Sequence, residues 1–203
     1  MNKYIDSEII FNEEISDGIF KLVLKGKFQG DPGQFYMLRA WDESPLLPRP
    51  LSICDLDEES ITFLYAVVGK GTSIISSMRV GESIKILGPL GNGFELHPEA
   101  KCAIVAGGIG IAPMKYLSRK LKNVDLYVGY RNTTYKSTFF NFLDKYFIGA
   151  IPIPPATIAH FASGCNSNPF PNGPRILMLS PTLIDEIIDV PLPTTAYKNV
   201  ILS

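Results

Sequence analysis

The stretch RPLSICD, residues 49–55, places an arginine and a serine on either side of Pro50 and Leu51. An arginine presents a rigid fork of donors that suits a phosphate, and a serine hydroxyl can donate to or accept from a ring nitrogen. Pro50 favours extended backbone between Arg49 and Ser52. The pattern is typical of a segment that binds a flat, negatively charged ligand. Taken alone, the stretch favours a simpler interpretation, an exposed arginine beside a strand serine.

A second stretch, LYAVVGKGT at residues 64–72, carries groups that complement the first. Tyr65 supplies an aromatic ring that can cover a planar ligand. Gly71 and Thr72 can offer backbone and hydroxyl donors to a phosphate. The alternative is that Gly71 merely begins a turn.

A third stretch, AGGIGIAPM at residues 106–114, follows an apolar run and opens a predicted helix. Gly108 and Gly110 allow the backbone to approach a pyrophosphate, and Pro113 stands where the dinucleotide fingerprint has its third glycine. A tight strand-to-helix turn that binds nothing is the alternative. Arg131 follows the next apolar run, where an acidic residue would hold a ribose, so the choice between NADH and NADPH stays open.

Other motifs give weaker signals. GPLGNGF, residues 88–94, has three glycines around a proline and an asparagine, which predicts a tight turn or a hinge. His97 and His160 have no candidate ligand or nucleophile at a suitable spacing, and no nucleophile elbow of a serine hydrolase is present.

The three cysteines indicate neither a disulfide framework nor a metal site. Cys54, Cys102 and Cys165 are odd in number and widely separated, which fits neither a disulfide framework nor a closely spaced metal knuckle. Buried, reduced thiols are expected.

The elements that must position these groups begin with strands. From Ile9 to about Ile86, short segments rich in β-branched and aromatic residues alternate with Gly, Pro, Asp or Glu. About six short strands at this spacing predict a small antiparallel barrel.

A different pattern follows, with a boundary near residues 97–101. CAIVAG, residues 102–107, is an apolar run of the buried-strand type, residues 113–121 have helical periodicity, and VDLYVGY, residues 124–130, is a second apolar run. A strand, a helix and a strand in this order predict a parallel sheet. A second amphipathic helix is expected at about residues 134–146.

The sequence changes again after Tyr146. Nine of the sixteen prolines fall between residues 151 and 193, and charged residues nearly vanish there. ILMLSPTLIDEIIDV, residues 176–190, predicts a strand and then a short helix that begins at Ser180. A doubly wound domain usually contains more regular material than this.

Composition limits the class of protein. The chain has 203 residues, 46% of them hydrophobic, and a formal net charge of -1. These values predict a soluble globular protein and disfavour nucleic acid or anionic membrane as partners. The sequence shows neither a signal peptide nor a membrane span, so the cytoplasm is the expected compartment.

Together and in order, PGQFYMLRAW, RPLSICD, LYAVVGKGT, GPLGNGF, AGGIGIAPM and LYVGYR resemble the ferredoxin reductase-like superfamily. RPLS and PLGNGF look most like the electron transfer subunits of class B dihydroorotate dehydrogenases, over about residues 4–146. The resemblance implies an FAD-binding Greek-key β-barrel over residues 1–97. It also implies a parallel-sheet, NAD-binding α/β domain over residues 98–203, which looks incomplete because residues 147–203 are atypical.

The resemblance also implies roles for residues. It places Arg49 at the FAD pyrophosphate and Ser52 near the reactive edge of the isoalloxazine. The full set implied for FAD is Arg49, Pro50, Leu51, Ser52, Leu64, Tyr65, Ala66, Gly71 and Thr72. The set implied for the nicotinamide dinucleotide is Gly107, Gly108, Gly110 and Pro113.

In such proteins NADH reduces FAD, and a [2Fe-2S] cluster passes electrons to the FMN of a separate catalytic subunit that oxidises dihydroorotate, a step of pyrimidine biosynthesis. The resemblance therefore implies an electron transfer subunit rather than a complete enzyme. Two alternatives stay open. One is a stand-alone NAD(P)H-dependent flavin or ferredoxin reductase, and the other is a non-catalytic or truncated flavin-binding module.

The chain departs from the family after Tyr146. Family members continue with a Cys-Gly-Pro strand and a segment of four cysteines, whereas Cys165 stands alone here and a cluster needs four thiolates. A shift of reading frame and a divergent, truncated relative would each explain the change.

Overall fold

The computed structural model describes residues 3–96, 101–129, 147–149, 177–179 and 199–202. The chain divides into two compact units. The first comprises Met1–Glu95 with Lys115–Leu117, and the second comprises Leu96–Met114 with Ser118–Ser203. We describe each unit by itself.

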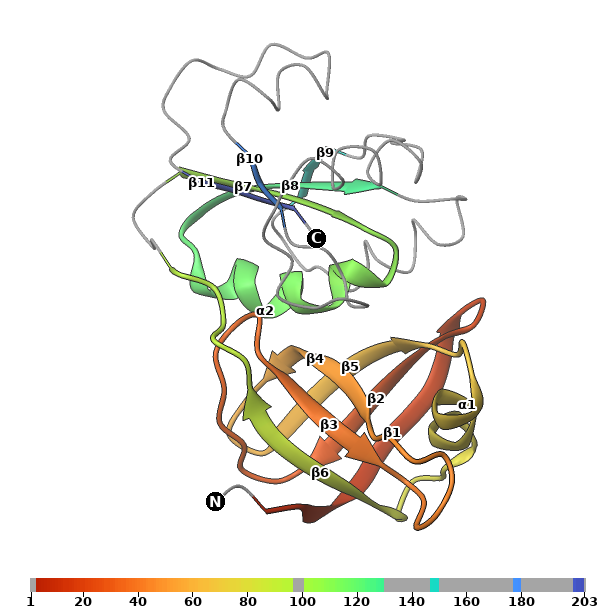
Figure 1. Cartoon of the computed structure of the whole chain (residues 1–203). Coiled ribbons are helices and arrows are strands. Elements are labelled where there is room, and N and C mark those ends of the chain that lie inside the picture. The colour runs from red at the N-terminus through yellow and green to blue at the C-terminus, as the bar shows by residue number, and fades with distance from the viewer. Residues whose placement is uncertain (1–2, 97–100, 130–146, 150–176, 180–198, 203) are drawn as a thin grey trace. The chain divides into compact units, whose positions relative to one another are not determined.

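The first unit is built on a closed barrel of six antiparallel strands, as the sequence predicts (Figure 1). Their order around the barrel is β1-β2-β5-β4-β3-β6, so the chain crosses between neighbours in the manner of a Greek key. The strands are β1 (Ile5–Ser16), β2 (Ile19–Lys25), β3 (Phe35–Arg39), β4 (Arg49–Leu56), β5 (Ser60–Ala66) and β6 (Ser83–Leu90).

The barrel forms because apolar residues alternate along its strands. In β2, for example, Leu22 and Leu24 are fully buried while Lys25 is exposed. Phe63 and Tyr65 are the largest side chains that this core encloses, at 0% and 1% exposure. The core also includes Ile9, Tyr36, Leu38, Leu51, Ile53, Ile61, Ile75, Ile84 and Ile86.

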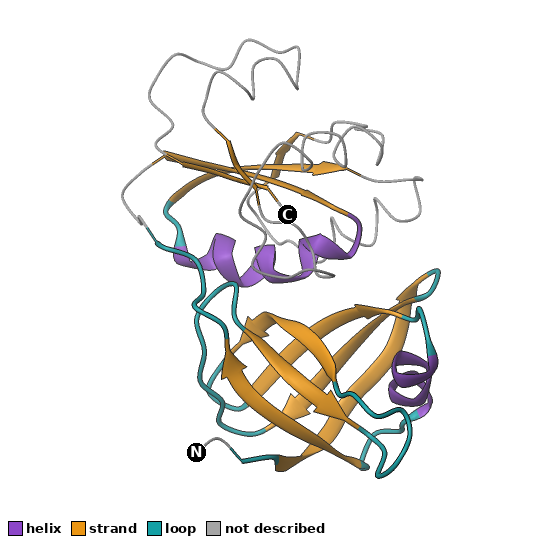
Figure 2. Ribbon diagram, in the orientation of Figure 1, coloured by secondary structure: helices purple, strands orange, loops and turns teal. Residues whose placement is uncertain are grey.

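A short helix, α1 (Lys70–Ser77), follows β5 (Figure 2). The sequence does not predict this helix, and a turn that begins at Gly71 is the one local structure expected there. Ile75 carries the helix into the barrel core. Asn12 of β1 secures its far end, because the amide Nδ2 donates to the carbonyls of Ile75 at 2.8 Å and Met78 at 2.9 Å. The Ile75 carbonyl also accepts from the Met78 N–H at 3.1 Å, so Asn12 adds to the backbone bond that ends the helix.

The second unit contains a sheet in the order β10-β11-β7-β8-β9. Its described elements are β7 (Lys101–Gly107), a 3-10 turn (Gly108–Ile111), α2 (Ala112–Lys120), β8 (Asn123–Gly129), β9 (Phe147–Gly149), β10 (Leu177–Leu179) and β11 (Asn199–Leu202). β11, β7, β8 and β9 pair in parallel, and β10 pairs antiparallel with β11. The predicted strand, helix and strand of a parallel sheet are thereby confirmed.

The region after Tyr146 contributes more to this sheet than its composition predicts. The strand expected within residues 176–190 is present as β10, but β9 and β11 were not expected. Each has at most four residues, too few for a periodicity to register. The expected helices at residues 134–146 and from Ser180 lie outside the described residues. Within the described part of the chain, no helix is long and apolar enough to cross a membrane.

Because the Tyr65 hydroxyl is buried, we expect the barrel to lose stability as the pH becomes alkaline. Burial raises the pKa of Tyr65, and a hydrogen bond from its hydroxyl to Asn12 Oδ1 opposes that shift only in part. A tyrosine in the unfolded chain ionises near pH 10. The stabilisation is therefore fully present below about pH 10 and is lost as the pH rises toward the raised pKa of the folded state.

We expect the free energy of unfolding of the native chain to fall more steeply between about pH 9 and 11.5 than that of a Tyr65→Phe variant. Urea unfolding at several pH values measures this difference. Tyr4→Phe, which changes a tyrosine that is 40% exposed, is the matched control and keeps the native slope. Identical slopes for the native chain and Tyr65→Phe would contradict the expectation.

Candidate functional site

The best candidate for a ligand site in the first unit is a group of three residues, Arg49, Trp41 and Gly71, which we call the Arg49 cluster. Arg49 is the first residue of β4 and is half-buried. Its guanidinium carbon lies 5.7 Å from the centroid of the Trp41 ring, within the range of a cation–π contact. Among the described residues Arg49 makes no ion pair or hydrogen bond. Its donors are therefore available to an anion.

Gly71 brings α1 against this arginine. A Cβ atom built on Gly71 would lie 2.2 Å from Arg49 Nε and 2.9 Å from Trp41 Cη2, closer than side chains approach one another. The backbone conformation of Gly71 is one that other residues adopt, so the requirement for glycine here is one of space. The helix can approach Arg49 because position 71 has no side chain.

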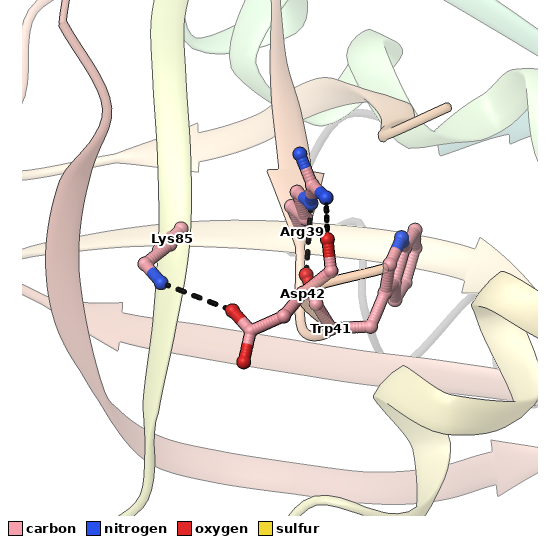
Figure 3. Close-up of polar contacts among 4 residues, drawn as sticks. All are labelled: Arg39, Trp41, Asp42 and Lys85. Atoms are coloured by element: carbon pink, nitrogen blue, oxygen red, sulfur yellow. Dashed lines mark hydrogen bonds and ion pairs between the residues drawn. The ribbon is translucent and has the colours of Figure 1, made fainter. Parts of the chain in front are cut away.

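The loop that carries Trp41 is fixed by Arg39, the last residue of β3. Arg39 Nε donates to the Trp41 carbonyl at 2.8 Å, and Arg39 Nη2 donates to the Asp42 carbonyl (Figure 3). Lys85 of β6 lies 3.6 Å from the Asp42 carboxylate, but both groups are largely exposed, and such pairs contribute little. Arg39 is therefore the main anchor of the backbone behind Trp41.

Thr72 caps the first turn of α1. Its Oγ1 accepts from the backbone N–H groups of Val68 at 3.0 Å and Gly69 at 3.2 Å, and donates to the Gly69 carbonyl at 3.0 Å. The hydroxyl therefore uses its proton within the turn. In the described structure this hydroxyl shapes the turn beside Gly71, and its donation to a phosphate stays a prediction.

Tyr65 also differs from the expectation. Its ring stacks on Phe20 with centroids 5.6 Å apart and is only 1% exposed, so it is enclosed in the core and cannot cover a ligand. A single sequence does not reveal this because β5 is buried along Ile61–Tyr65 on both faces rather than alternating. Any contribution of Tyr65 to a ligand site has to come from its backbone.

The other residues implied for FAD lie on the same two strands. In β4, Pro50 is exposed, Ser52 is half-buried and Leu51 is buried. Ser52 is three positions after Arg49 along an extended strand, so the two positions are about 10 Å apart. In β5, Leu64 is buried and Ala66 is half-buried.

The predicted nicotinamide loop lies in the second unit at the carboxyl end of β7. Gly107 ends the strand, and Gly108 has φ +57°, a left-handed conformation that favours glycine. Gly108 is exposed and its Cβ position is open, whereas Gly110 is buried. Pro113 lies in the first turn of α2, as predicted. The loop therefore has the strand, turn and helix context that a dinucleotide fingerprint requires.

GPLGNGF packs against its own barrel. Gly91 and Gly93 have φ of +86° and +74°, and the Gly91 carbonyl accepts from Gln34 Nε2 at 2.7 Å. Phe94 N–H donates to the Pro32 carbonyl at 2.8 Å. In the described structure residues 88–90 end β6 and a bend follows at Gly91, so the tight turn and the hinge both stay predictions.

Metal ligation finds no support in the described residues, which contain no group of three or more His, Cys, Asp or Glu side chains that could hold an ion. Cys54 is fully buried, as expected. Burial raises the pKa of its thiol, so the thiolate that a metal requires is disfavoured.

Sequence reasoning missed Trp41, Arg39 and Asn12. Trp41 is the single tryptophan of the chain and follows a predicted strand, a weak signal that the analysis did not use. Arg39 and Asn12 carry no motif. Their partners are carbonyls whose positions only the folded chain defines.

A barrel followed by a parallel sheet is the fold of ferredoxin reductase-like proteins. The solved structure of phthalate dioxygenase reductase aligns with a TM-score of 0.66 at 18% identity, covering 98% of this chain and 67% of its own. The structure of an NADH-dependent reduced ferredoxin-NADP oxidoreductase aligns with a TM-score of 0.59 at 28% identity, covering 64% of this chain and 50% of its own. The predicted fold class is confirmed.

Within this class, sequence similarity is to one kind of subunit. The chain is 54% identical over 135 residues to the dihydroorotate dehydrogenase B (NAD(+)) electron transfer subunit of Clostridium acetobutylicum, a match that covers 65% of this chain and 55% of the relative. It is 36% identical over 140 residues to the subunit of the same name from Clostridium perfringens, covering 66% and 56%. The resemblance read from the motifs is confirmed.

The chain thus spans about half the length of the curated relatives it matches. No family model matches it.

The Thr72 cap gives a test of how the site is built. Thr72→Val removes three hydrogen bonds at the start of α1, and we expect the free energy of unfolding to fall by about 1 kcal/mol. Thr72→Ser keeps the hydroxyl and should recover most of that loss. Urea unfolding of the two variants measures the difference. Equal stabilities for the valine and serine variants would show that the hydroxyl is not the cap.

Proposed function

We propose that the first unit binds FAD, with the pyrophosphate at Arg49 and the reactive ring edge near Ser52. The observation that carries the proposal is the half-buried Arg49, whose donors have no acceptor among the described residues. Gly71 lies so close to this arginine that no larger residue fits at position 71 without displacing it. A guanidinium in such a place is suited to a phosphate.

The residues present therefore fit the pyrophosphate end of FAD. In the proposal Arg49 neutralises the phosphates, the first turn of α1 at Gly71 offers backbone N–H groups, and Thr72 holds that turn in shape. In the proposal the strand backbone contributes at Leu51, Leu64, Tyr65 and Ala66. The exposed Pro50 keeps β4 extended between Arg49 and Ser52. Bound FAD would supply the electron chemistry, and the protein supplies placement and hydrogen bonding.

For the second unit we propose a nicotinamide dinucleotide at Gly107, Gly108, Gly110 and Pro113. The exposure and left-handed backbone of Gly108 support the proposal, because they leave the turn open to close approach by a pyrophosphate. Either NADH or NADPH suits these residues.

The similarity to dihydroorotate dehydrogenase B electron transfer subunits supports a wider proposal. In it, the chain passes electrons between NAD(H) and a separate, FMN-containing catalytic subunit that acts on dihydroorotate in pyrimidine biosynthesis. The chain is then one part of a hetero-oligomer and is not a complete enzyme by itself.

A [2Fe-2S] cluster does not fit the residues of this chain. Four thiolates are needed, whereas the sequence holds three cysteines, and Cys54 is fully buried in the barrel. We therefore derive no electron transfer through a cluster here.

A second candidate function follows from that mismatch. A stand-alone NAD(P)H-dependent flavin or ferredoxin reductase needs no cluster of its own, and the structural similarity to a ferredoxin-NADP oxidoreductase favours it. The third possibility, a non-catalytic flavin-binding module, shares the FAD site but needs no working nicotinamide loop.

One set of spectra separates these functions. We expect the purified chain to bind added FAD and to show flavin absorbance that bleaches when NADH is added without oxygen. Reduction of a soluble acceptor by the chain alone would favour the stand-alone reductase, and reduction only with the catalytic subunit present would favour the electron transfer subunit. Flavin binding without bleaching would leave the binding module. A chain that takes up no FAD would overturn all three.

Gly71 supplies a sharper test of the FAD site. In Gly71→Ala the new Cβ displaces the flexible end of Arg49, so we expect FAD to bind about tenfold more weakly. The new Cβ would also lie 2.9 Å from Trp41 Cη2, so urea unfolding of the ligand-free protein is measured beside the affinity to separate a loss of stability from a loss of FAD binding. Gly69→Ala is the matched control, since its Cβ meets nothing within 4 Å, and should keep native affinity. Unchanged affinity in Gly71→Ala would refute the assignment of Arg49.

A further inference from the structure

We propose that Trp41 is a positioning residue, which holds the Arg49 guanidinium in the orientation that receives the flavin pyrophosphate. The inference rests on the proposed FAD site and assigns a role that the sequence motifs do not contain. Trp41 acts through Arg49 and is not required to touch the reacting ring.

The contacts around Arg49 define this role. The indole lies 5.7 Å from the guanidinium carbon, and Gly71 abuts both side chains. Arg49 has no carboxylate or carbonyl partner among the described residues, so the indole and the first turn of α1 are what restrict it. An unrestrained arginine loses side-chain entropy when it is fixed in one geometry. An arginine that is already stacked has less freedom to lose when the ligand binds.

The contact with the indole also leaves the arginine able to bind phosphate. The indole attracts the cation through its π face and accepts no hydrogen bond from the guanidinium N–H groups. A carboxylate partner would instead occupy those donors and neutralise the charge. Trp41 therefore orients the cation without competing for the anion.

The backbone behind Trp41 is held firmly enough for this task. Arg39 donates to two successive carbonyls, those of Trp41 and Asp42 (Figure 3). Farther along the same loop, Ser44 Oγ accepts from Lys70 Nζ at 2.9 Å, which links the loop to the first residue of α1. The loop and the helix that enclose Arg49 are thus tied to the barrel and to each other.

A double-mutant cycle tests the coupling. The Kd for FAD is measured by fluorescence titration for the native chain, Trp41→Leu, Arg49→Leu and the double variant. Trp41→Leu should weaken FAD binding about fivefold when Arg49 is present. It should have almost no effect in the Arg49→Leu background, since nothing is then left to orient.

Two further arms distinguish positioning from damage to the fold. Trp41→Phe keeps an aromatic face and loses the indole N–H, and it should bind FAD within about twofold of the native chain. Riboflavin has no phosphate, so its affinity should be the same in the native chain and in Trp41→Leu.

The inference is overturned by any of three results. These are native FAD affinity in Trp41→Leu, an equal loss of FAD and riboflavin affinity in that variant, or a Trp41→Phe defect as large as that of Trp41→Leu. The last result would instead assign the indole N–H to the ligand. If the native chain binds no FAD, the proposed function itself fails. The titration of the unmutated protein alone gives this result.

Discussion

The side-chain amide of Asn12 determines where helix α1 lies against the barrel, and the candidate site depends on that placement. Its two donors hold carbonyls at the end of the helix, and its oxygen accepts from the buried hydroxyl of Tyr65. The three hydrogen bonds are part-buried, so breaking them carries a desolvation cost. One strand, one helix and one core aromatic are thereby held in a single arrangement, which sets the distance from Gly71 to Arg49.

The candidate site combines residues on rigid barrel strands with residues on the segments that connect them. The closed barrel supplies the strands that carry Arg49 and Ser52, and a closed sheet has no free edge to distort. The loop after β3 and the first turn of α1 supply the groups around the arginine. This division, a scaffold with binding groups on its connections, is common among proteins because connections can vary without disturbing the core.

The sequence predicts the barrel and the β7-α2-β8 unit well, because both depend on local periodicity that each segment carries by itself. It also points to Arg49 and Gly71, whose types suit phosphate. It fails where function depends on partners far along the chain. Asn12 meets Ile75 across 63 residues and Tyr65 across 53, and no local pattern records such contacts. Tyr65 misled for the same reason, since an aromatic residue of a doubly buried strand and one that faces a ligand look alike in sequence.

Cys54 has a consequence for the durability of a protein of this kind. Reduced flavins that meet oxygen produce peroxide, which attacks cysteine through the thiolate form. The Cys54 side chain is fully enclosed in the barrel wall, and its raised pKa keeps it protonated. A thiol in this position is shielded both from access and from activation. If the barrel binds a flavin as proposed, it can carry this sulfur atom without making it a target of oxidative damage.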